Sequence, residues 1–239
     1  MDGVMSGTIN ILSDNRTTNP DRFGCEHGLS VLVRTPSANI LMDTGASGLF
    51  AVNAARMGID LSDVDYVFLS HGHSDHVGGL KTFLDLNSKA KVIVSPDAVS
   101  GRFYSGRGGL HSISCDWPLS QMQGRTIAVT DTMTLAVGMQ VIARIPQRHP
   151  LPSDNRLLTV RREGGLVPDD FSHEMACYVD GLLYTGCAHN GLENILDACY
   201  PQVSFLTGHC TGNGAFRILQ SVMGSRLRQF ACGMQIDMK

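Results

Sequence analysis

Four side chains that can bind a metal ion lie within six positions of the sequence. Residues 65–80 read DYVFLSHGHSDHVGGL, which places His71, His73, Asp75 and His76 directly after an apolar stretch. Imidazole and carboxylate groups are ligands of zinc and related divalent ions, with bond lengths of about 2.0–2.2 Å. A loop of ordinary surface polar residues is the alternative, but three histidines in so short a stretch favour metal binding. The spacing therefore predicts a metal site, completed by ligands from other segments.

The apolar pattern around this segment predicts alternating strands and helices. We expect strands at residues 7–12, 29–34, 39–43, 65–70, 91–95, 139–145, 174–180, 182–186 and 203–208, and helices at 47–58, 77–86, 190–199 and 214–230. Strands and helices in both halves indicate an α/β class, and short links favour a single domain over residues 1–239. Segments 101–125 and 146–170 are rich in Gly and Ser or in Pro and charge, so we expect loops that shape a binding site.

Composition argues against several classes of partner. The formal charge is −3 and there is no run of Lys and Arg, so we expect no nucleic-acid binding. No apolar run approaches the ~20 residues of a membrane helix, so we expect no membrane partner. The start, MDGVMSGTINILSD, has neither the basic nor the apolar region of a signal peptide. Seven scattered cysteines without a CxxC pair favour reduced thiols and a cytoplasmic location over a secreted protein that has lost its leader.

The motif HxHxDH, formed by His71, His73, Asp75 and His76, resembles the fingerprint of the metallo-β-lactamase superfamily. NILMDTG, LLYTGC and FLTGH are similar to three of its strands: the early strand with its Asp-Thr-Gly-like turn, the strand that usually ends in a bridging Asp, and the strand with the last His ligand. GLVPDDFSHEMACYV, TGCAHNGLENI and GHCTG resemble a narrower branch, related to 7,8-dihydropterin-6-methyl-4-(β-D-ribofuranosyl)aminobenzene-5′-phosphate synthase. The resemblance implies a four-layer αββα sandwich and one or two divalent metal ions, with zinc as first choice and manganese or iron as alternatives.

The resemblance also implies a division of the ligands. His71 and His73 would belong to a first metal site, and Asp75 and His76 to a second site that His209 closes. Two residues are candidates for the third ligand of the first site. His173, in FSHEMACYV, is the better candidate, and His149, in QRHPLP, is more typical of an exposed loop.

The sequence departs from the family pattern at TGCAH. Cys187 stands where most relatives have a bridging Asp, and His189 follows two positions later. Alternate positions of an extended segment face one way, so either side chain could reach the metals. We expect His189 to be a ligand with Cys187 close by; the alternative for Cys187 is a small buried apolar side chain.

Asp43, in LMDTG, permits two interpretations. Asp-Thr-Gly is typical of aspartic proteases, but those need two carboxylates about 3 Å apart, and this triplet occurs once. The resemblance instead implies that Asp43 lies beneath the metal site and accepts a hydrogen bond from a metal-binding histidine.

The expected reaction is hydrolysis of an ester, lactone, thioester or phosphodiester by a metal-activated water. Asp75 would orient that water and could take its proton. Arg102, Tyr104 and Arg107, in SGRFYSGRGGLH, could bind an anionic group of a small-molecule substrate, or could simply be exposed loop residues. Two other functions stay open: transfer of a pterin methyl group, as the branch implies, and metal binding or sensing without catalysis.

Overall fold

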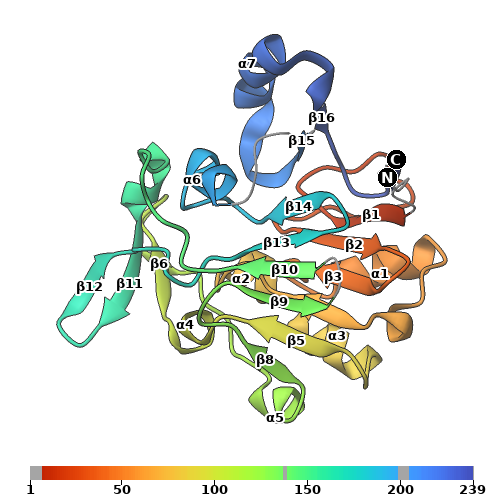
Figure 1. The fold of residues 1–239 in the computed structure, drawn as a ribbon, viewed down its shortest axis with the longest axis horizontal. Coiled ribbons are helices and arrows are strands. Elements are labelled where there is room, and N and C mark those ends of the chain that lie inside the picture. The colour runs from red at the N-terminus through yellow and green to blue at the C-terminus, as the bar shows by residue number, and fades with distance from the viewer. Residues whose placement is uncertain (1–6, 137–138, 199–204, 239) are drawn as a thin grey trace.

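Seven strands form the largest sheet of the computed structural model, which describes residues 7–136, 139–198 and 205–238 (Figure 1). The strand order is β17-β1-β2-β3-β4-β5-β8, antiparallel from β17 to β3 and parallel from β3 to β8. The strands are β1 Gly7–Ser13, β2 Ser30–Arg34, β3 Asn39–Met42, β4 Tyr66–Phe68, β5 Lys91–Val94, β8 Thr126–Ala128 and β17 Gln235–Met238. The carboxyl ends of parallel strands lie at one edge of a sheet, which brings the residues after β3 and β4 together there.

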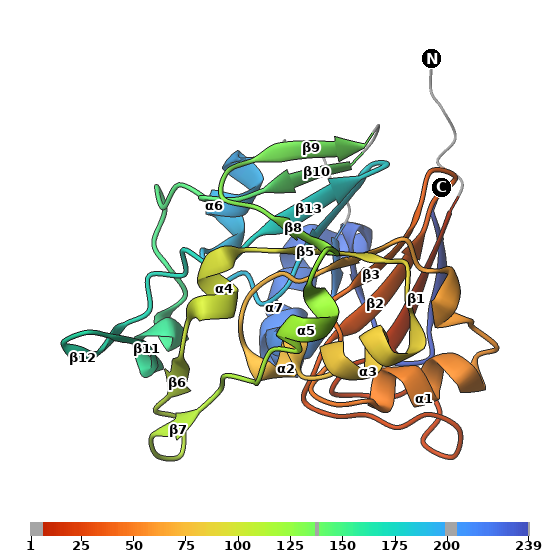
Figure 2. The same cartoon turned by 90° about the horizontal axis from the view of Figure 1, so that it is seen from below.

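Helices α1 (Leu49–Arg56) and α3 (Leu80–Leu86) cover one face of this sheet (Figure 2). Phe50 and Phe83 are fully buried in one apolar cluster with inward-facing strand residues such as Leu41. The predicted helix at 77–86 proves to be two helices, because α2 (Ser74–Val77) precedes α3, and α2 carries Asp75 and His76. Short helices α4 (Pro96–Ser100) and α5 (Leu119–Met122) and the 3₁₀ turn η1 (Leu61–Asp63) complete this region.

A second sheet packs against the other face of the first. Its order is β14-β13-β10-β9, from β9 Met133–Ala136, β10 Met139–Ile142, β13 Ala176–Val179 and β14 Leu182–Thr185. Val31 and Met42 of the first sheet share a buried core with Val141 and Cys177 of the second. Ile195 of α6 (Leu192–Asp197) packs on the outer face of the second sheet. The layers are therefore helix, sheet, sheet and helix, which confirms the predicted αββα class.

The prediction of loops at 101–125 and 146–170 is wrong in part. These segments pair with each other in a third sheet, β12-β11-β6-β7, which projects from the sandwich (Figure 1). Its strands are β6 Phe103–Ser105, β7 His111–Ser112, β11 Leu158–Arg162 and β12 Gly165–Pro168, and η2 (Ser153–Leu157) precedes β11. Phe103 pairs with Val160 across a long intervening sequence. Such pairing depends on tertiary context rather than on local pattern, so composition alone indicated a loop.

The predicted helix at 214–230 is too long. Helix α7 spans Gly212–Met223, and the chain then passes through η4 (Gly224–Arg226) into β16 (Leu227–Gln229). Strand β16 pairs in parallel with β15 (Phe205–Thr207), and η3 (His209–Thr211) follows β15. The start of the strand predicted at 203–208 lies outside the described residues. Among the helices that are described, none is long and apolar enough to cross a membrane.

Candidate metal centre

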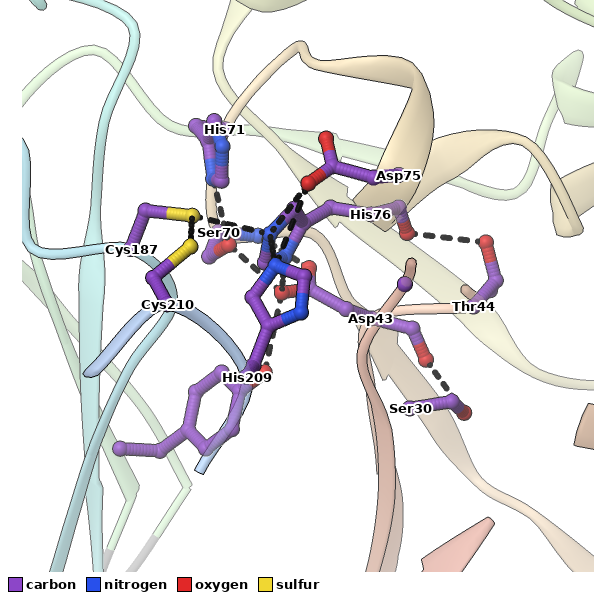
Figure 3. Close-up of polar contacts among 12 residues, drawn as sticks. Ser30, Asp43, Thr44, Ser70, His71, Asp75, His76, Cys187, His209 and Cys210 are labelled. Carbon is purple, nitrogen blue, oxygen red and sulfur yellow. Dashed lines mark hydrogen bonds and ion pairs between the residues drawn. The ribbon is translucent and has the colours of Figure 1, made fainter. Parts of the chain in front are cut away.

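Asp75, His76, Cys187 and His209 converge at the edge of the sandwich (Figure 3). The His76 Nε2 atom lies 3.1 Å from Cys187 Sγ and 3.2 Å from His209 Nε2. Asp75 Oδ2 lies 3.2 Å from His209 Nε2. Two imidazole nitrogens, a carboxylate oxygen and a sulfur at these spacings form a donor set that suits a divalent metal ion. We call these four residues the second cluster.

His71, His73 and His189 form a neighbouring group, the first cluster. Their Nε2 atoms are buried, and none has a hydrogen-bond partner among the described residues. A buried polar atom without a partner is costly, so three that face one another require an explanation. A shared divalent cation with three imidazole ligands satisfies all of them. The rings of His71 and His76 are 4.1 Å apart, which makes the two clusters adjacent.

Four of these histidines form a hydrogen bond through Nδ1, the ring nitrogen that does not face the clusters. His189 Nδ1 donates to Asn155 Oδ1 at 3.0 Å, and His209 Nδ1 donates to Asn15 Oδ1 at 2.9 Å. His76 and His71 are held in the same way, by Asp43 and Ser70. Each Nδ1 therefore carries the proton, and each Nε2 lone pair is left free to bind a metal.

Asp43 lies beneath both clusters, where the resemblance placed it. Its carboxylate accepts hydrogen bonds from His76 Nδ1 (2.6 Å), the Ser70 backbone N–H (2.7 Å), the Ser70 hydroxyl (2.6 Å) and the Tyr184 hydroxyl (2.9 Å). Because the Ser70 hydroxyl donates to Asp43, its oxygen accepts from His71 Nδ1 at 2.9 Å. One buried carboxylate thus orients a histidine of each cluster.

Three loops reach the centre through strained or crowded backbone. Asp43, Ala188 and His209 have φ of 57°, 55° and 38°, in the left-handed region that L-residues seldom occupy. A Cβ atom at Gly186 would collide with the Ser70 hydroxyl, so only glycine lets the end of β14 lie this close to His71. Strain of this kind is typical of functional sites.

The two clusters differ in protonation. Burial, reinforced by neighbouring histidines, holds the pKa of His71 and His189 well below the usual value. Burial also disfavours charge on His76 and His209, but Asp75 and Asp43 raise the pKa of His76, and Asp75 with Cys210 raises that of His209 to about 10. Burial opposes ionisation of Asp75, yet His76 and His209 lower its pKa. Without metal, the first cluster is neutral and the second is an ion-paired network.

Glu174 fixes the loop that carries His189. Its buried carboxylate accepts the backbone N–H groups of His189 and Asn190, each at 2.7 Å, and burial raises its pKa. Glu174 lies within FSHEMACYV, but no feature of the sequence indicated this role. Asn15 and Asn155 were also missed, because each comes from a loop distant in sequence from the histidine that it contacts.

His173 lies beside the first cluster and is not one of its three histidines. Its Nδ1 accepts the Gly72 N–H at 3.1 Å, and its Nε2 donates to Asp169 Oδ2 at 3.2 Å. Asp169 Oδ2 is also 3.8 Å from His73 Nε2. His73, Asp169 and His173 thus form a third group with metal-binding side chains. Both ring nitrogens of His173 already have partners, which leaves His189 as the histidine that accompanies His71 and His73.

Phe103, rather than its neighbours, reaches the centre from the third sheet. Its ring lies 4.1 Å from that of His173 and 5.4 Å from that of His73. Arg102 and Tyr104 alternate with Phe103 along β6, so they face the other way. Tyr104 stacks against Arg161, whose guanidinium carbon is 5.3 Å from the ring centre.

Two other residues of interest lie outside the clusters. Arg107 lies in an exposed turn, where its backbone N–H donates to Ser105 Oγ at 3.2 Å. His149 is 40% exposed at its side chain and pairs with Asp197 at 2.9 Å. The structure therefore brings five predicted histidines together with Asp75 and Cys187: His71, His73, His76, His189 and His209. Arg102, Tyr104 and Arg107 do not join them.

Cys210 was not predicted to lie at the centre. Its sulfur is 3.1 Å from that of Cys187 at the solvent side of the second cluster (Figure 3). The contact with Cys187 and the neighbouring His209, against the effect of burial, lower the pKa of Cys210 to about 4. GHCTG places it next to His209, and that adjacency was the signal in the sequence.

Comparison with known proteins shows which superfamily the chain resembles. A family model for the metallo-β-lactamase superfamily matches residues 23–114. The crystal structure of Tm1679, a metal-dependent hydrolase of the β-lactamase superfamily, superposes with a TM-score of 0.78 and 25% identity, over 96% of this chain and 98% of that one. The chain is therefore similar to the metallo-β-lactamase superfamily, in sequence over residues 23–114 and in fold over most of its length.

Two proteins of Methanocaldococcus jannaschii are similar in sequence. An uncharacterized protein is 27% identical over 191 residues, which span 79% of this chain and 72% of the relative. The 7,8-dihydropterin-6-methyl-4-(β-D-ribofuranosyl)-aminobenzene-5′-phosphate synthase is 23% identical over 191 residues, 73% of this chain and 65% of the relative. The match thus spans just under two thirds of the synthase.

The similarity to the metallo-β-lactamase superfamily agrees with the geometry of the centre. The superfamily motif supplies His71 and His73 to the first cluster and Asp75 and His76 to the second. The departure at TGCAH supplies one residue to each: His189 joins the first cluster and Cys187 the second. Two positions on one short loop therefore serve two clusters, and Ala188 between them has a left-handed backbone.

Proposed function

We propose that this protein is a metal-dependent hydrolase with a dinuclear centre, acting on an ester, lactone, thioester or phosphodiester. The observation that carries the proposal is the set of three buried, unpartnered Nε2 atoms of His71, His73 and His189 beside the second cluster. Those atoms suit a divalent cation, and the adjacent donors suit another. The fold and the superfamily, whose members are mostly hydrolytic metalloenzymes, support the same reaction class.

Bound ions would supply a water of lowered pKa as nucleophile and would polarise the bond to be cleaved. Asp75 is placed to orient that water, because its Oδ2 is shared between His209 Nε2 at 3.2 Å and His76 Nε2 at 3.6 Å. Its lowered pKa keeps it ionised at neutral pH, so it can accept the water's proton. Asp43, Asn15 and Asn155 hold the imidazoles in position and take no part in bond cleavage.

The donor sets favour zinc over manganese. Cys187 adds a sulfur to the second cluster, and thiolate ligands select zinc over hard ions. The first cluster has three imidazoles, which suit zinc or iron. Burial and contact with Cys210 raise the pKa of Cys187, so binding of a metal there must release the thiol proton. The thiols of the six described cysteines are free, which agrees with a reducing, cytoplasmic setting.

Transfer of a pterin methyl group is the second candidate. It is favoured by the similarity to the M. jannaschii synthase. Incubation with a dihydropterin pyrophosphate and an aminobenzene acceptor, followed by product analysis, separates the two functions. A condensation product would support the transferase, and release of hydrolysed substrate alone would support the hydrolase.

The test of hydrolysis begins with metal-free protein reconstituted separately with zinc, manganese and iron. Each preparation is assayed on carboxylic esters, lactones, thioesters and phosphodiesters. We expect turnover that requires metal and that falls by about 100-fold or more in Asp75→Asn. His149→Ala, which removes a surface histidine that belongs to neither cluster, should retain wild-type turnover. Metal-loaded protein without turnover on every class would contradict the proposal and favour metal binding without catalysis.

A further inference from the structure

A large apolar cavity opens from the second cluster. Its volume is about 360 Å³, and Cys187, His209 and Cys210 form its metal-facing end. One wall consists of apolar residues of β1 and β2, including Ile11 and Val31. Strand β14 forms the opposite wall. The third side includes Leu206 of β15, Phe230, and Leu219, which lies on α7.

The size of this cavity is unusual for a protein interior. Interiors are close-packed, with few voids larger than a water molecule. A volume of 360 Å³ would hold about a dozen groups of the size of water or methylene. It falls within the range of small-molecule sites, which are mostly apolar with a few polar groups. Thr185, which also lines the cavity, has a buried hydroxyl oxygen without a partner among the described residues.

The lining determines which chemical group would fit. Among its described residues there is no lysine or arginine, so the cavity offers no ion pair to a phosphate or carboxylate. Ile11 and Val31 are 1% and 4% exposed and pack in the core between the two sheets. An aliphatic chain that entered there would gain apolar burial along its whole length, whereas a charged group would lose its hydration.

We propose that the cavity receives the aliphatic acyl chain of an ester or thioester substrate, with the bond to be cleaved at the Cys187 and His209 end. The inference rests on the proposed hydrolase function and narrows its substrate class. Hydrolysis adds the elements of water across the acyl bond: the acyl carbon gains a hydroxyl group, and the alcohol or thiol leaves with the proton. Both products balance without any further reactant.

Binding of straight-chain carboxylates tests the cavity without requiring turnover. Calorimetric titration of zinc-loaded protein with acetate through tetradecanoate measures affinity against chain length. We expect affinity to rise by up to about fourfold per methylene. The rise should level off once the cavity is filled, at about a dozen carbons. Affinity that does not depend on chain length would overturn the inference.

Two adjacent aliphatic residues of α7, Ile218 and Leu219, supply a matched pair of variants. Leu219 lines the cavity and is 41% exposed, whereas Ile218, beside it, is 69% exposed and is not part of the lining. Leu219→Gln should weaken decanoate binding severalfold and leave acetate binding unchanged, and Ile218→Gln should change neither. Equal effects of the two variants, or none, would contradict the assignment.

Filling the cavity provides a second, independent variant. Leu206→Trp, at a partly buried lining position, should make affinity level off at a shorter chain while acetate binding is retained. An unchanged profile in a folded Leu206→Trp protein would overturn the inference. Chain-length-dependent binding without ester or thioester hydrolysis would instead retain the cavity as a binding site and reject the proposed function.

Discussion

The Asp43 carboxylate connects the two clusters through four hydrogen bonds, to Ser70, His76 and Tyr184. It orients His76 directly and orients His71 through the Ser70 hydroxyl. A neutral amide at this position cannot accept all of these donors, because its NH₂ group would face N–H and O–H hydrogens. The position of Asp43 therefore affects metal affinity without contact between Asp43 and the metal.

Asp43→Asn should weaken metal binding about 10- to 100-fold, as expected when a partner of a metal-binding histidine is lost. Competition with a chelating dye measures the change. Asp85→Asn is the control, because Asp85 is an exposed residue of α3 that pairs with Lys81. Equal affinities for wild type and Asp43→Asn would show that Asp43 does not support the centre.

The two clusters should respond differently to pH. His71 and His189 have lowered pKa values and are already neutral near pH 7, so metal binding there displaces few protons. His76 and His209 have raised pKa values, about 10 for His209, and Cys187 must also lose a proton. Metal binding to the second cluster therefore releases protons, and its affinity should increase as pH rises from about 6 to about 9.

Calorimetry in buffers of different ionisation enthalpy counts the protons released for each bound metal. We expect the tighter, first equivalent of zinc to release fewer protons than the second. Equal proton release for both equivalents would contradict the assigned protonation states.

The sequence predicted the side chains that gather at the centre better than the side chains that hold them in place. HxHxDH is local in sequence, and a tight turn after a strand brings its members together in any such fold. Asn155 and Asn15 contact His189 and His209 from 34 and 194 positions away. Those contacts depend on tertiary packing, so no local pattern could have predicted them.

At the scale of single elements, the loop after β14 depends on Glu174. Its charged carboxylate accepts two backbone N–H groups, from His189 and Asn190. Glu174→Gln replaces one acceptor oxygen by a donor and should destabilise the protein by about 1.5–3 kcal/mol. It should also weaken metal binding to the first cluster, because His189 loses its backbone anchor.

Thermal unfolding with and without zinc measures both effects of Glu174→Gln. Glu193→Gln serves as the control, because Glu193 is an exposed residue of nearby α6. If Glu174→Gln and Glu193→Gln unfold at the same temperature, the loop does not depend on this carboxylate.

The third sheet positions one aromatic side chain against the histidines. Phe103 is 2% exposed and packs on His173 and His73, whereas Tyr104, on the opposite face of β6, is partly exposed. Phe103→Ala should cost about 3–5 kcal/mol in the free energy of unfolding. Tyr104→Ala should cost clearly less. Urea denaturation distinguishes the two, and similar losses would contradict this orientation of β6.

On the scale of the whole molecule, regular alternation of strands and helices was sufficient to predict the α/β class, and the resemblance to the superfamily implied the sandwich. Buried strands such as β3 and β5 are continuous apolar runs, and α1 begins and ends near its predicted bounds. The third sheet and β16 were missed because their strands are short and pair with distant segments. The cavity beside Cys187 was likewise beyond prediction, since it arises from the packing of whole layers.

The same arrangement explains why the centre lies where it does. Strand ends of the two large sheets meet at one edge of the sandwich beside the end of β15, so the residues after β3, β4, β14 and β15 converge (Figures 1 and 3). Both large sheets and the segment after β15 contribute members of the clusters, and the rigid strands behind them hold the geometry. We propose that this edge holds two adjacent divalent ions.

Elemental analysis of zinc-reconstituted protein tests that claim most directly. We predict about two zinc ions per chain in the wild type, and about one in His71→Ala and in His209→Ala, because each variant removes a ligand of one cluster only. His149→Ala should bind as much zinc as the wild type. Zinc content that is unchanged in both ligand variants would contradict the account.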